Sequence, residues 1–204
     1  MSTAQLRLDL IAEADFPSEF GHFRLFGFEG RFDDGRLEEC LALVMGDISG
    51  DPPLVRLHSE CLTGDVLHSL RCDCRNQLTA ALERIAEAER GLLIYEHQEG
   101  RGIGLMNKLR AYALQDQGAD TVEANEALGF QADLRNFTMP SAIVRHFGLR
   151  QVRLMSNNPD KIAALTRAGV EVTERLPIEM PPLASREAYM RTKKHRLGHL
   201  LENT

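Results

Sequence analysis

The change of hydrophobic period along the chain restricts its fold more than any other feature. Residues 22–29 alternate polar with apolar side chains, residues 40–45 are a continuous apolar run, and residues 54–58 are a third segment of this kind, so all three are predicted strands. A turn over residues 47–53, rich in proline and glycine, joins the last two strands. From residue 76 onward the apolar side chains recur instead at the spacing of an amphipathic helix.

Helices and strands then alternate toward the C-terminus. The predicted helices cover residues 76–90, 105–117, 121–128, 141–147 and 159–168, and the predicted strands cover residues 92–95, 152–155 and 170–175. The early connections are too short for helical crossovers, which favours a mixed sheet over a purely parallel one. We therefore predict an α/β fold with a mixed β-sheet flanked by helices. One domain would span residues 1–204, with a C-terminal loop and helix at about 176–204.

Charge and apolar patterning limit the classes of function. The formal net charge of −6 disfavours nucleic-acid binding, which usually goes with a basic surplus. Charges interrupt the N-terminal segment, which does not fit a signal peptide, and no segment has the roughly 20 apolar residues that span a bilayer. We therefore expect a cytoplasmic protein without a membrane partner, whose reduced cysteines bind metal or pack in the core. Cys40, which opens an apolar run, is predicted to be a core residue.

Three cysteines, Cys61, Cys72 and Cys74, lie within the fourteen-residue run C-L-T-G-D-V-L-H-S-L-R-C-D-C. Thiolates at this spacing suit zinc, and three ligands leave one position of the ion open for water, as in catalytic zinc sites. One alternative is three buried, reduced cysteines that pack as hydrophobes. Another is a structural zinc with a fourth ligand from one of the nearby histidines, His58, His68 or His97.

Other polar residues each allow two interpretations. His58 is a core histidine or a metal ligand, and Glu60 is an ordinary strand-end carboxylate or a group that orients or deprotonates a metal-bound water. Tyr112 lies in the middle of a predicted helix, where its ring would pack in the core unless the phenol reaches a ligand. Asp133 and Arg135 would share one face of an extended segment, either as a surface ion pair or as two groups aimed into a pocket.

Two segments are candidates for phosphate binding. The first, Q-E-G-R-G-I-G at residues 98–104, has three alternate glycines that would let the backbone approach a ligand, although a flexible turn has the same pattern. Lys108 and Arg110, on the helix that follows, are interpreted as solvated cations. The second, S-N-N-P-D-K, opens a helix whose amides and Lys161 would attract an anion, and a plain N-cap by Asn158 is the simpler interpretation.

Four long motifs occur in a fixed order along the chain. They are R-L-H-S-E-C-L-T-G-D-V-L-H-S-L-R-C-D-C, H-Q-E-G-R-G-I-G-L, N-K-L-R-A-Y-A-L-Q-D-Q-G-A-D-T-V-E-A-N and S-N-N-P-D-K. With them the chain resembles the GTP cyclohydrolase II family, from about Phe20 to the final G-H-L-L. The resemblance implies an enzyme of riboflavin biosynthesis that opens the imidazole ring of GTP and releases C8 as formate and the outer phosphates as pyrophosphate. The product would be 2,5-diamino-6-(5-phosphoribosylamino)pyrimidin-4(3H)-one, and the enzyme would be a homodimer with one Zn²⁺ per subunit and Mg²⁺ on the triphosphate.

The resemblance also assigns roles to individual residues. The zinc ligands would be the three clustered cysteines. The GTP contacts would be Arg56, Leu57, His58, Ser59, Glu60, Gln77, Glu99, Gly100, Arg101, Thr121, Ser156 and Lys161. Asp133 matches the proton acceptor, Arg135 the nucleophile toward the α-phosphate, and Tyr112 the tyrosine that accompanies full ring opening and deformylation. Because arginine is a poor nucleophile at its usual pKa, a purely electrostatic role for Arg135 is physically simpler.

Three positions depart from the family pattern, and three other functions compete with the main one. Arg75 and Asn76 stand in place of a glycine and an aromatic residue, so Arg75 would bring a charge near the metal, and Gly102 replaces a frequent asparagine. A variant that retains the formyl group is disfavoured by Tyr112. A non-catalytic GTP-binding regulator is disfavoured by the intact candidate site, and a nucleic-acid-binding zinc module by the acidic net charge.

Overall fold

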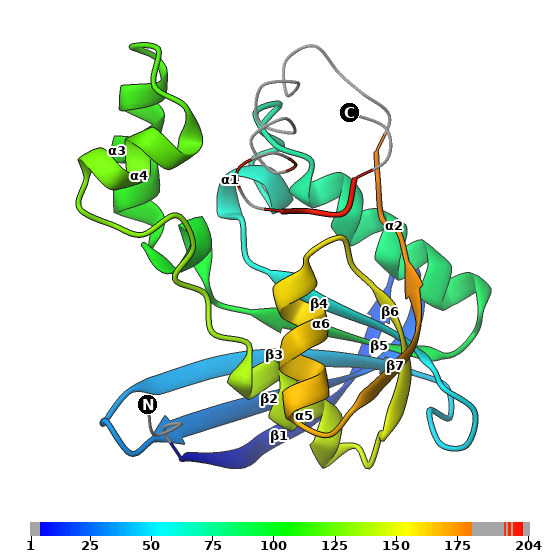
Figure 1. Cartoon of the computed structure of the whole chain (residues 1–204). Coiled ribbons are helices and arrows are strands. Elements are labelled where there is room, and N and C mark those ends of the chain that lie inside the picture. The colour runs from blue at the N-terminus through cyan, green and yellow to red at the C-terminus, as the bar shows by residue number, and fades with distance from the viewer. Residues whose placement is uncertain (1–4, 181–193, 195, 197, 202–204) are drawn as a thin grey trace.

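A computed structural model describes residues 5–180, 194, 196 and 198–201 of the protein (Figure 1). Its centre is a seven-stranded sheet with the strand order β1-β2-β3-β5-β4-β6-β7. The strands are β1 (Leu6–Ser18), β2 (Gly21–Phe32), β3 (Leu37–Met45), β4 (Leu54–Ser59), β5 (Gly91–Glu96), β6 (Gln151–Met155) and β7 (Glu171–Leu176). Pairing is antiparallel from β1 to β5 and parallel from β5 to β7. The predicted α/β fold with a mixed sheet is therefore confirmed.

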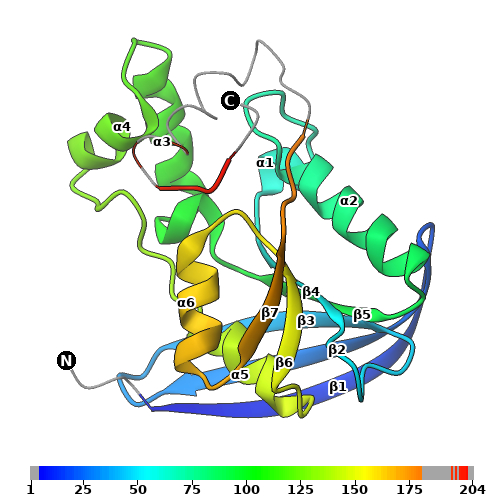
Figure 2. The ribbon, with the colours of Figure 1, turned by 45° about the vertical axis from the view of Figure 1, so that its right-hand side comes forward.

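Helices cover both faces of this sheet, and others lie beyond its end. The helices are α1 (Leu62–Asp65), α2 (Cys74–Glu87), the 3₁₀ helix η1 (Glu99–Gly102), α3 (Leu105–Gln115), α4 (Thr121–Ala127), α5 (Thr138–His146) and α6 (Pro159–Arg167). Helix α2 packs on one face, and α5 and α6 pack on the other (Figure 2). Helices α3 and α4 stand beyond the end of the sheet, next to α1 (Figure 1).

The apolar periodicity explains which strands lie deepest. Ala81 and Ile85, one turn apart on α2, are fully buried against Leu93 of β5. On the opposite face, Ile143 of α5 and Leu165 of α6 pack into a core that includes the predicted core residue Cys40. Strands β4 and β5 are buried on both faces, which explains the apolar run of β5, whereas β4 also buries the polar residues Arg56 and His58.

Strand β1 is the element that the sequence analysis missed. It pairs with β2 along its whole length at the edge of the sheet, with an irregularity between Leu10 and Ala12. Most of its side chains are exposed, so charged residues occupy many positions and hide the alternation of Leu6, Leu8 and Leu10. The period of two was present, but the charges between the leucines obscured it.

The parallel half of the sheet brings three separate segments to one edge. Residues 60–61 follow β4, residues 97–101 follow β5, and residues 156–161 follow β6. Because these strands are parallel neighbours, their carboxyl ends lie at the same edge, where α/β sheets commonly bind ligands. The candidate site is built there.

The C-terminal loop and helix, predicted at about 176–204, differ from prediction at their end. Residues 198–201 are not helical, so the predicted helix does not continue to Leu201. Leu201 is nevertheless buried, and the backbone N–H of Leu200 donates to the carbonyl of Asn157 at 2.9 Å. Residues 194 and 196 are helical, as predicted, and the remaining residues of the predicted loop and helix, 181–193, 195, 197 and 202–204, lie outside the described part of the chain. Among the described helices, none is long and apolar enough to cross a membrane.

Candidate metal and nucleotide site

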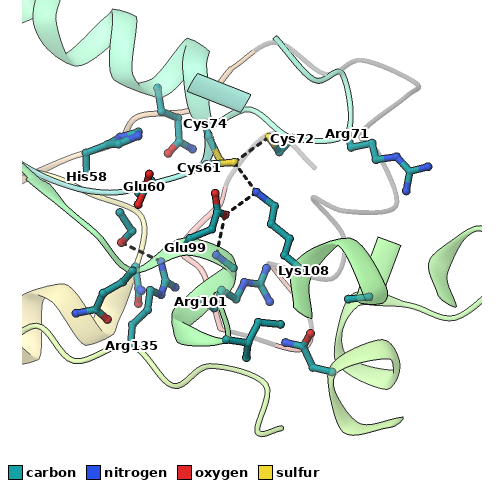
Figure 3. A pocket seen from close by; sticks show the side chains of 18 of the residues that line it. His58, Glu60, Cys61, Arg71, Cys72, Cys74, Glu99, Arg101, Lys108 and Arg135 are labelled. Carbon is teal, nitrogen blue, oxygen red and sulfur yellow. Dashed lines mark hydrogen bonds and ion pairs between the residues drawn. The ribbon is translucent and has the colours of Figure 1, made fainter. Parts of the chain in front are cut away.

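The three clustered cysteines lie together just beyond the carboxyl end of β4. Cys61 follows β4, Cys72 lies in the loop after α1, and Cys74 is the first residue of α2. Their sulfur atoms all lie within 4.8 Å of one another, and those of Cys61 and Cys72 are 3.7 Å apart (Figure 3). Within the described residues this is the one group of three candidate metal ligands, and no histidine belongs to it.

Gly64 shows that the space among the sulfurs is tightly shaped. A Cβ atom at this position would lie 2.8 Å from the Cys72 sulfur and 3.1 Å from the Cys61 sulfur. The backbone of α1 at Gly64 therefore lies directly against the sulfurs, and a side chain at this position would force them apart. Three soft donors around a side-chain-free wall fit a thiophilic ion such as zinc.

The charges of the cysteines depend on one another. Hydrogen bonds from the Cys72 and Cys74 thiols, helped by the Lys108 ammonium, lower the pKa of the Cys61 thiol. The pKa values of Cys72 and Cys74 are raised because Cys61 already carries the charge beside them. A dication among the sulfurs would remove this repulsion and let all three ionise.

Lys108 was interpreted from sequence as a solvated cation, and that interpretation is wrong. Its side chain is buried, with the ammonium 3.1 Å from the Cys61 sulfur and 2.7 Å from Oε1 of Glu99 (Figure 3). Burial alone would lower the pKa of Lys108, but the Cys61 and Glu99 charges outweigh it and raise the pKa. The helical spacing held the missed signal, since Lys108 is one turn before Tyr112 and shares its face.

His58 belongs to a buried network under the cysteine loop. Asp65 accepts hydrogen bonds from the backbone N–H of Cys61 and the hydroxyl of Tyr95, both at 3.0 Å, and its carboxylate lies 3.1 Å from His58 Nε2. Burial lowers the pKa of His58, which favours the neutral ring. The structure thus supports a core histidine that braces the loop, in place of a fourth metal ligand.

A cavity of about 490 Å³ opens beside the cysteines and collects most of the predicted residues. The predicted GTP contacts that line it are Arg56, His58, Ser59, Glu60, Gln77, Glu99, Gly100, Arg101, Ser156 and Lys161, and Tyr112, Arg135 and the three cysteines line it as well. Leu57 does not line the cavity, because its side chain is in the core, although its carbonyl accepts a hydrogen bond from Lys161. The side chain of Thr121 lies outside the described part, but its neighbour Asp120 lines the cavity.

A second part of the cavity lining, here called the cationic wall, contains the buried side chains of Arg56 and Lys161. Arg56 donates to the carbonyl of Met155 and to Gln77, each at 2.8 Å, and burial lowers its pKa to about 10. Lys161 donates to the carbonyl of Leu57 at 2.8 Å and to the Ser59 hydroxyl at 3.1 Å. Burial lowers the pKa of Lys161 to about 7.

The start of α6, before Lys161, fits both the N-cap and the ligand-binding interpretation of the S-N-N-P-D-K motif. The side chain of Asn158 accepts a hydrogen bond from the backbone N–H of Asp160 at 2.9 Å, so the predicted N-cap is confirmed. The N–H group of the Asn158 side chain is buried without a hydrogen-bond partner among the described residues, and Asn158 lines the cavity. The cap therefore also carries a donor that a ligand could satisfy.

Asp133 and Arg135 form a partly buried pair and not a surface ion pair. Nε of Arg135 is 2.9 Å from Oδ1 of Asp133, and the side chains are 11% and 22% exposed, respectively. Burial raises the pKa of Asp133, but the bonds from Arg135 outweigh it and lower the pKa. Arg135 lines the cavity, and its guanidinium lies 3.4 Å from the Ser59 hydroxyl. Asp133 does not line the cavity and accepts the hydrogen bonds that hold Arg135 in place.

Tyr112 and Arg75 contact different parts of the cysteine loop. The Tyr112 hydroxyl lies 3.3 Å from the Thr63 hydroxyl, so the phenol reaches the loop between the cysteines. Arg75 does not line the cavity and instead contacts the exposed His68. Its charge is therefore directed toward solvent, contrary to the expectation that it would act near the metal.

Glu60 occupies the cavity wall one residue before Cys61. Its Oε2 atom is 3.0 Å from Nδ1 of His97, and its side chain is 25% exposed. The carboxylate is thus oriented by a neighbour while it stays open to the cavity.

Comparison with known proteins gives consistent matches over most of the chain. A family model described as GTP cyclohydrolase II matches residues 9–177. A GTP cyclohydrolase-2 of Histophilus somni is 54% identical over 196 residues, which cover 96% of this chain and 89% of that protein. A GTP cyclohydrolase-2 of Yersinia pseudotuberculosis is 53% identical over 197 residues, which cover 96% of this chain and 99% of that protein. A crystal structure of a two-domain 3,4-dihydroxy-2-butanone 4-phosphate synthase from A. baumannii is a distant likeness, with 20% identity, a TM-score of 0.46, and coverage of 85% of this chain and 40% of that chain.

Proposed function

The chain belongs to the GTP cyclohydrolase II family, enzymes that hydrolyse GTP in riboflavin biosynthesis, and on this premise we propose a full reaction for it. Zinc-dependent hydrolysis would open the imidazole ring of GTP, release C8 as formate and release pyrophosphate. The product would be 2,5-diamino-6-(5-phosphoribosylamino)pyrimidin-4(3H)-one. The observation that carries the proposal is the cluster of three sulfurs in the lining of a cavity that is also lined by Arg56, Arg101, Arg135 and Lys161.

The cysteines Cys61, Cys72 and Cys74 would hold one Zn²⁺ per subunit. When bound, zinc would act as a Lewis acid that lowers the pKa of water from about 15.7 toward about 7 and so supplies the hydroxide for C8. No histidine joins the cluster within the described residues, which supports an ion with an open position rather than a closed structural site.

We propose that two carboxylates, Glu60 and Asp133, handle protons in the reaction. Glu60 lines the cavity next to Cys61 and is oriented by His97, so it would accept a proton from the attacking water. Asp133 matches the family's proton acceptor, and its lowered pKa keeps it ionised. The Tyr112 hydroxyl, beside Thr63, would stabilise the oxygen or nitrogen that gains charge as the ring opens.

The cationic wall would bind the triphosphate together with Mg²⁺. Lys161, Arg101 and Arg135 line this side of the cavity and would offset the charge of the phosphates. We assign Arg135 an electrostatic role at the α-phosphate, because its pairing with Asp133 stabilises the protonated guanidinium, which cannot act as a nucleophile. Arg56, Ser59, Gln77 and the 99–101 segment would contact the nucleoside.

We also propose that the enzyme is a cytoplasmic homodimer formed by one domain per subunit. A reducing compartment keeps the three cysteines available for metal. Phe16, Leu37 and Leu41 are 36%, 55% and 37% exposed on one face of the antiparallel strands β1–β3. Exposed apolar side chains on adjacent strands are typical of protein interfaces. Leu41→Glu should therefore shift the mass measured by light scattering from dimer toward monomer.

One assay separates the main proposal from its alternatives. Zinc-loaded protein is incubated with GTP and Mg²⁺, and formate and pyrophosphate are measured. Equal amounts of both are expected. Pyrophosphate without formate would identify a variant that retains the formyl group. Tight GTP binding with neither product would identify a non-catalytic regulator.

A further inference from the structure

The Lys108 ammonium lies within hydrogen-bond distance of the Cys61 sulfur, and the proposed reaction assigns it no task. We propose that Lys108, held in place by Glu99, is a positioning residue of the metal centre that donates an N–H···S hydrogen bond to Cys61 and offsets the negative charge of the thiolates. This inference rests on the proposed metal site and concerns how strongly the sulfurs would donate charge to the ion.

The contacts of the ammonium leave little freedom in its position. It lies 3.1 Å from the Cys61 sulfur and 2.7 Å from Oε1 of Glu99. Lys108 is 9% exposed and Glu99 is 8% exposed, so both charges are sheltered from water. A sheltered, charge-assisted hydrogen bond is stronger than one at the surface.

Glu99 ties the lysine to the backbone of the cysteine loop. Its second oxygen, Oε2, accepts a hydrogen bond of 2.7 Å from the backbone N–H of Leu62, the residue after Cys61. The backbone N–H of Gly100 donates to Oε1 at 2.8 Å. One carboxylate therefore fixes both the ammonium and the loop that carries the sulfur, which is the arrangement by which outer residues orient metal ligands.

Gly100 makes room for the lysine stem. A Cβ atom there would lie 3.1 Å from the Lys108 Cβ, and the φ angle of Gly100 is +61°. The glycine-rich segment thus has a packing reason at this position, because a larger residue would push the lysine away from the sulfur. Lys108 and Tyr112 are also one helical turn apart, so α3 delivers both to the same cavity.

The charge balance gives the contact a chemical consequence. Three thiolates carry more negative charge than a divalent ion offsets, and strong sulfur donation makes that ion a weaker Lewis acid. A hydrogen bond from a cation withdraws electron density from the Cys61 sulfur. The ion would then keep more of its positive charge for polarising its fourth ligand.

Cobalt(II) substitution tests this directly, because sulfur-to-cobalt charge-transfer bands report the donor strength of the thiolates. The wild-type protein, Lys108→Met and the control Arg110→Met are loaded with Co²⁺ and compared. Arg110 lies on the same helix but is exposed and bonds to Asn107 at 2.7 Å, so the control removes a cation without touching the cluster. We expect the band of Lys108→Met alone to move to longer wavelength. Its kcat with zinc should fall by about 10- to 100-fold while KM for GTP changes little, and Lys108→Arg should recover part of the loss.

The outcomes distinguish this inference from the proposed function. A wild-type protein without a thiolate charge-transfer band would refute the metal site itself. A normal wild-type band that is unchanged in Lys108→Met would overturn the role of Lys108 and leave the metal site standing, as would a rise in KM with unchanged kcat. If Lys108→Met does not fold, Lys108→Gln keeps an N–H donor without the charge, and we expect a smaller shift in the same direction; no shift would again overturn the inference.

Discussion

The two buried lysines of the cavity lie in opposite electrostatic surroundings. Lys108 contacts the Cys61 sulfur and the Glu99 carboxylate, which raise its pKa above the ordinary value. Lys161 has Glu96 at 3.7 Å as a counter-charge, but burial, with Arg56 and Arg135 nearby, lowers its pKa to about 7. Lys108 is thus compensated by two adjacent groups, whereas Lys161 lies close to two other cations.

This difference indicates what each wall of the cavity lacks. The cysteine wall holds three sulfurs of which only one is readily ionised without a cation, so it would gain most from a dication. The cationic wall contains Arg56, Arg135 and Lys161 and would gain most from an anion. A nucleoside triphosphate with its reactive carbon toward the sulfurs and its phosphates toward the cations would satisfy both walls.

The largest effect is expected on the cysteine wall. Cys72→Ser should lose bound zinc and lower ring opening by roughly a thousand-fold or more, because the Lewis acid is lost with its ligand. Metal content and formate release are measured, with Cys40→Ser as the control, since Cys40 is a buried cysteine of the core and not of the cluster. Full activity in metal-free Cys72→Ser would rule out metal-dependent hydrolysis.

The next largest effect is expected for a change in the cationic wall. Lys161→Met should raise KM for GTP by about 100-fold, the usual cost of removing a buried charge that pairs with a ligand, and leave zinc content unchanged. Arg110→Met serves as the control for loss of an exposed cation. If zinc were lost together with GTP affinity, the two walls could not be treated as separate.

The pKa of Lys161 gives a pH-dependent form of the same comparison. Above pH 7 the free protein increasingly holds Lys161 neutral, and the phosphates of GTP would raise its pKa again. GTP binding at pH 8 should therefore take up a proton, and affinity should fall as the pH rises above 7. Calorimetry in buffers of different ionisation enthalpy measures the uptake. If the wild-type protein took up no more protons on binding GTP than Lys161→Met does, Lys161 would not be the group that binds the proton.

A smaller effect is expected at Tyr112, whose hydroxyl lies beside the cysteine loop. Tyr112→Phe should slow formate release by about tenfold and leave KM for GTP nearly constant, because the hydroxyl beside Thr63 would act mainly as charge develops. Steady-state kinetics separate the two parameters. A large rise in KM with unchanged kcat would show that the hydroxyl binds the substrate instead.

The smallest effect concerns the C-terminal residues that border the cavity. His199 lines the cavity, and Leu200 is anchored to Asn157 by a backbone hydrogen bond. His199→Ala should raise KM for GTP by about threefold, roughly the value of one ordinary hydrogen bond. Leu200→Ala is the control, because that side chain is 43% exposed. Equal KM values for all three proteins would remove His199 from the site.

Much of the fold could be predicted because buried strands and amphipathic helices have clear periods. The α2 pattern of Ala81 and Ile85 and the apolar run of β5 both depend on burial that the sequence records. Strand β1 was missed because an exposed edge strand admits charges, so burial leaves little trace in its sequence.

The site was predicted less evenly, for a physical reason. Motifs identified the cysteines, Tyr112 and Lys161, which line one cavity. Motifs did not reveal that Lys108 is buried, because a lysine in a helix is usually solvated and only the fold brings Cys61 and Glu99 to it. The contact joins residues 47 apart in the chain, a separation at which local patterns carry no information.

Zinc K-edge X-ray absorption of the purified protein tests the central claim most directly. We expect one zinc per chain with three sulfur atoms at about 2.3 Å and one lighter atom, consistent with Cys61, Cys72 and Cys74 and an open position. Adding a non-hydrolysable GTP analogue should leave the three sulfurs in place. A fourth sulfur or a histidine nitrogen in the shell, or no bound zinc at all, would contradict a catalytic metal at this cavity.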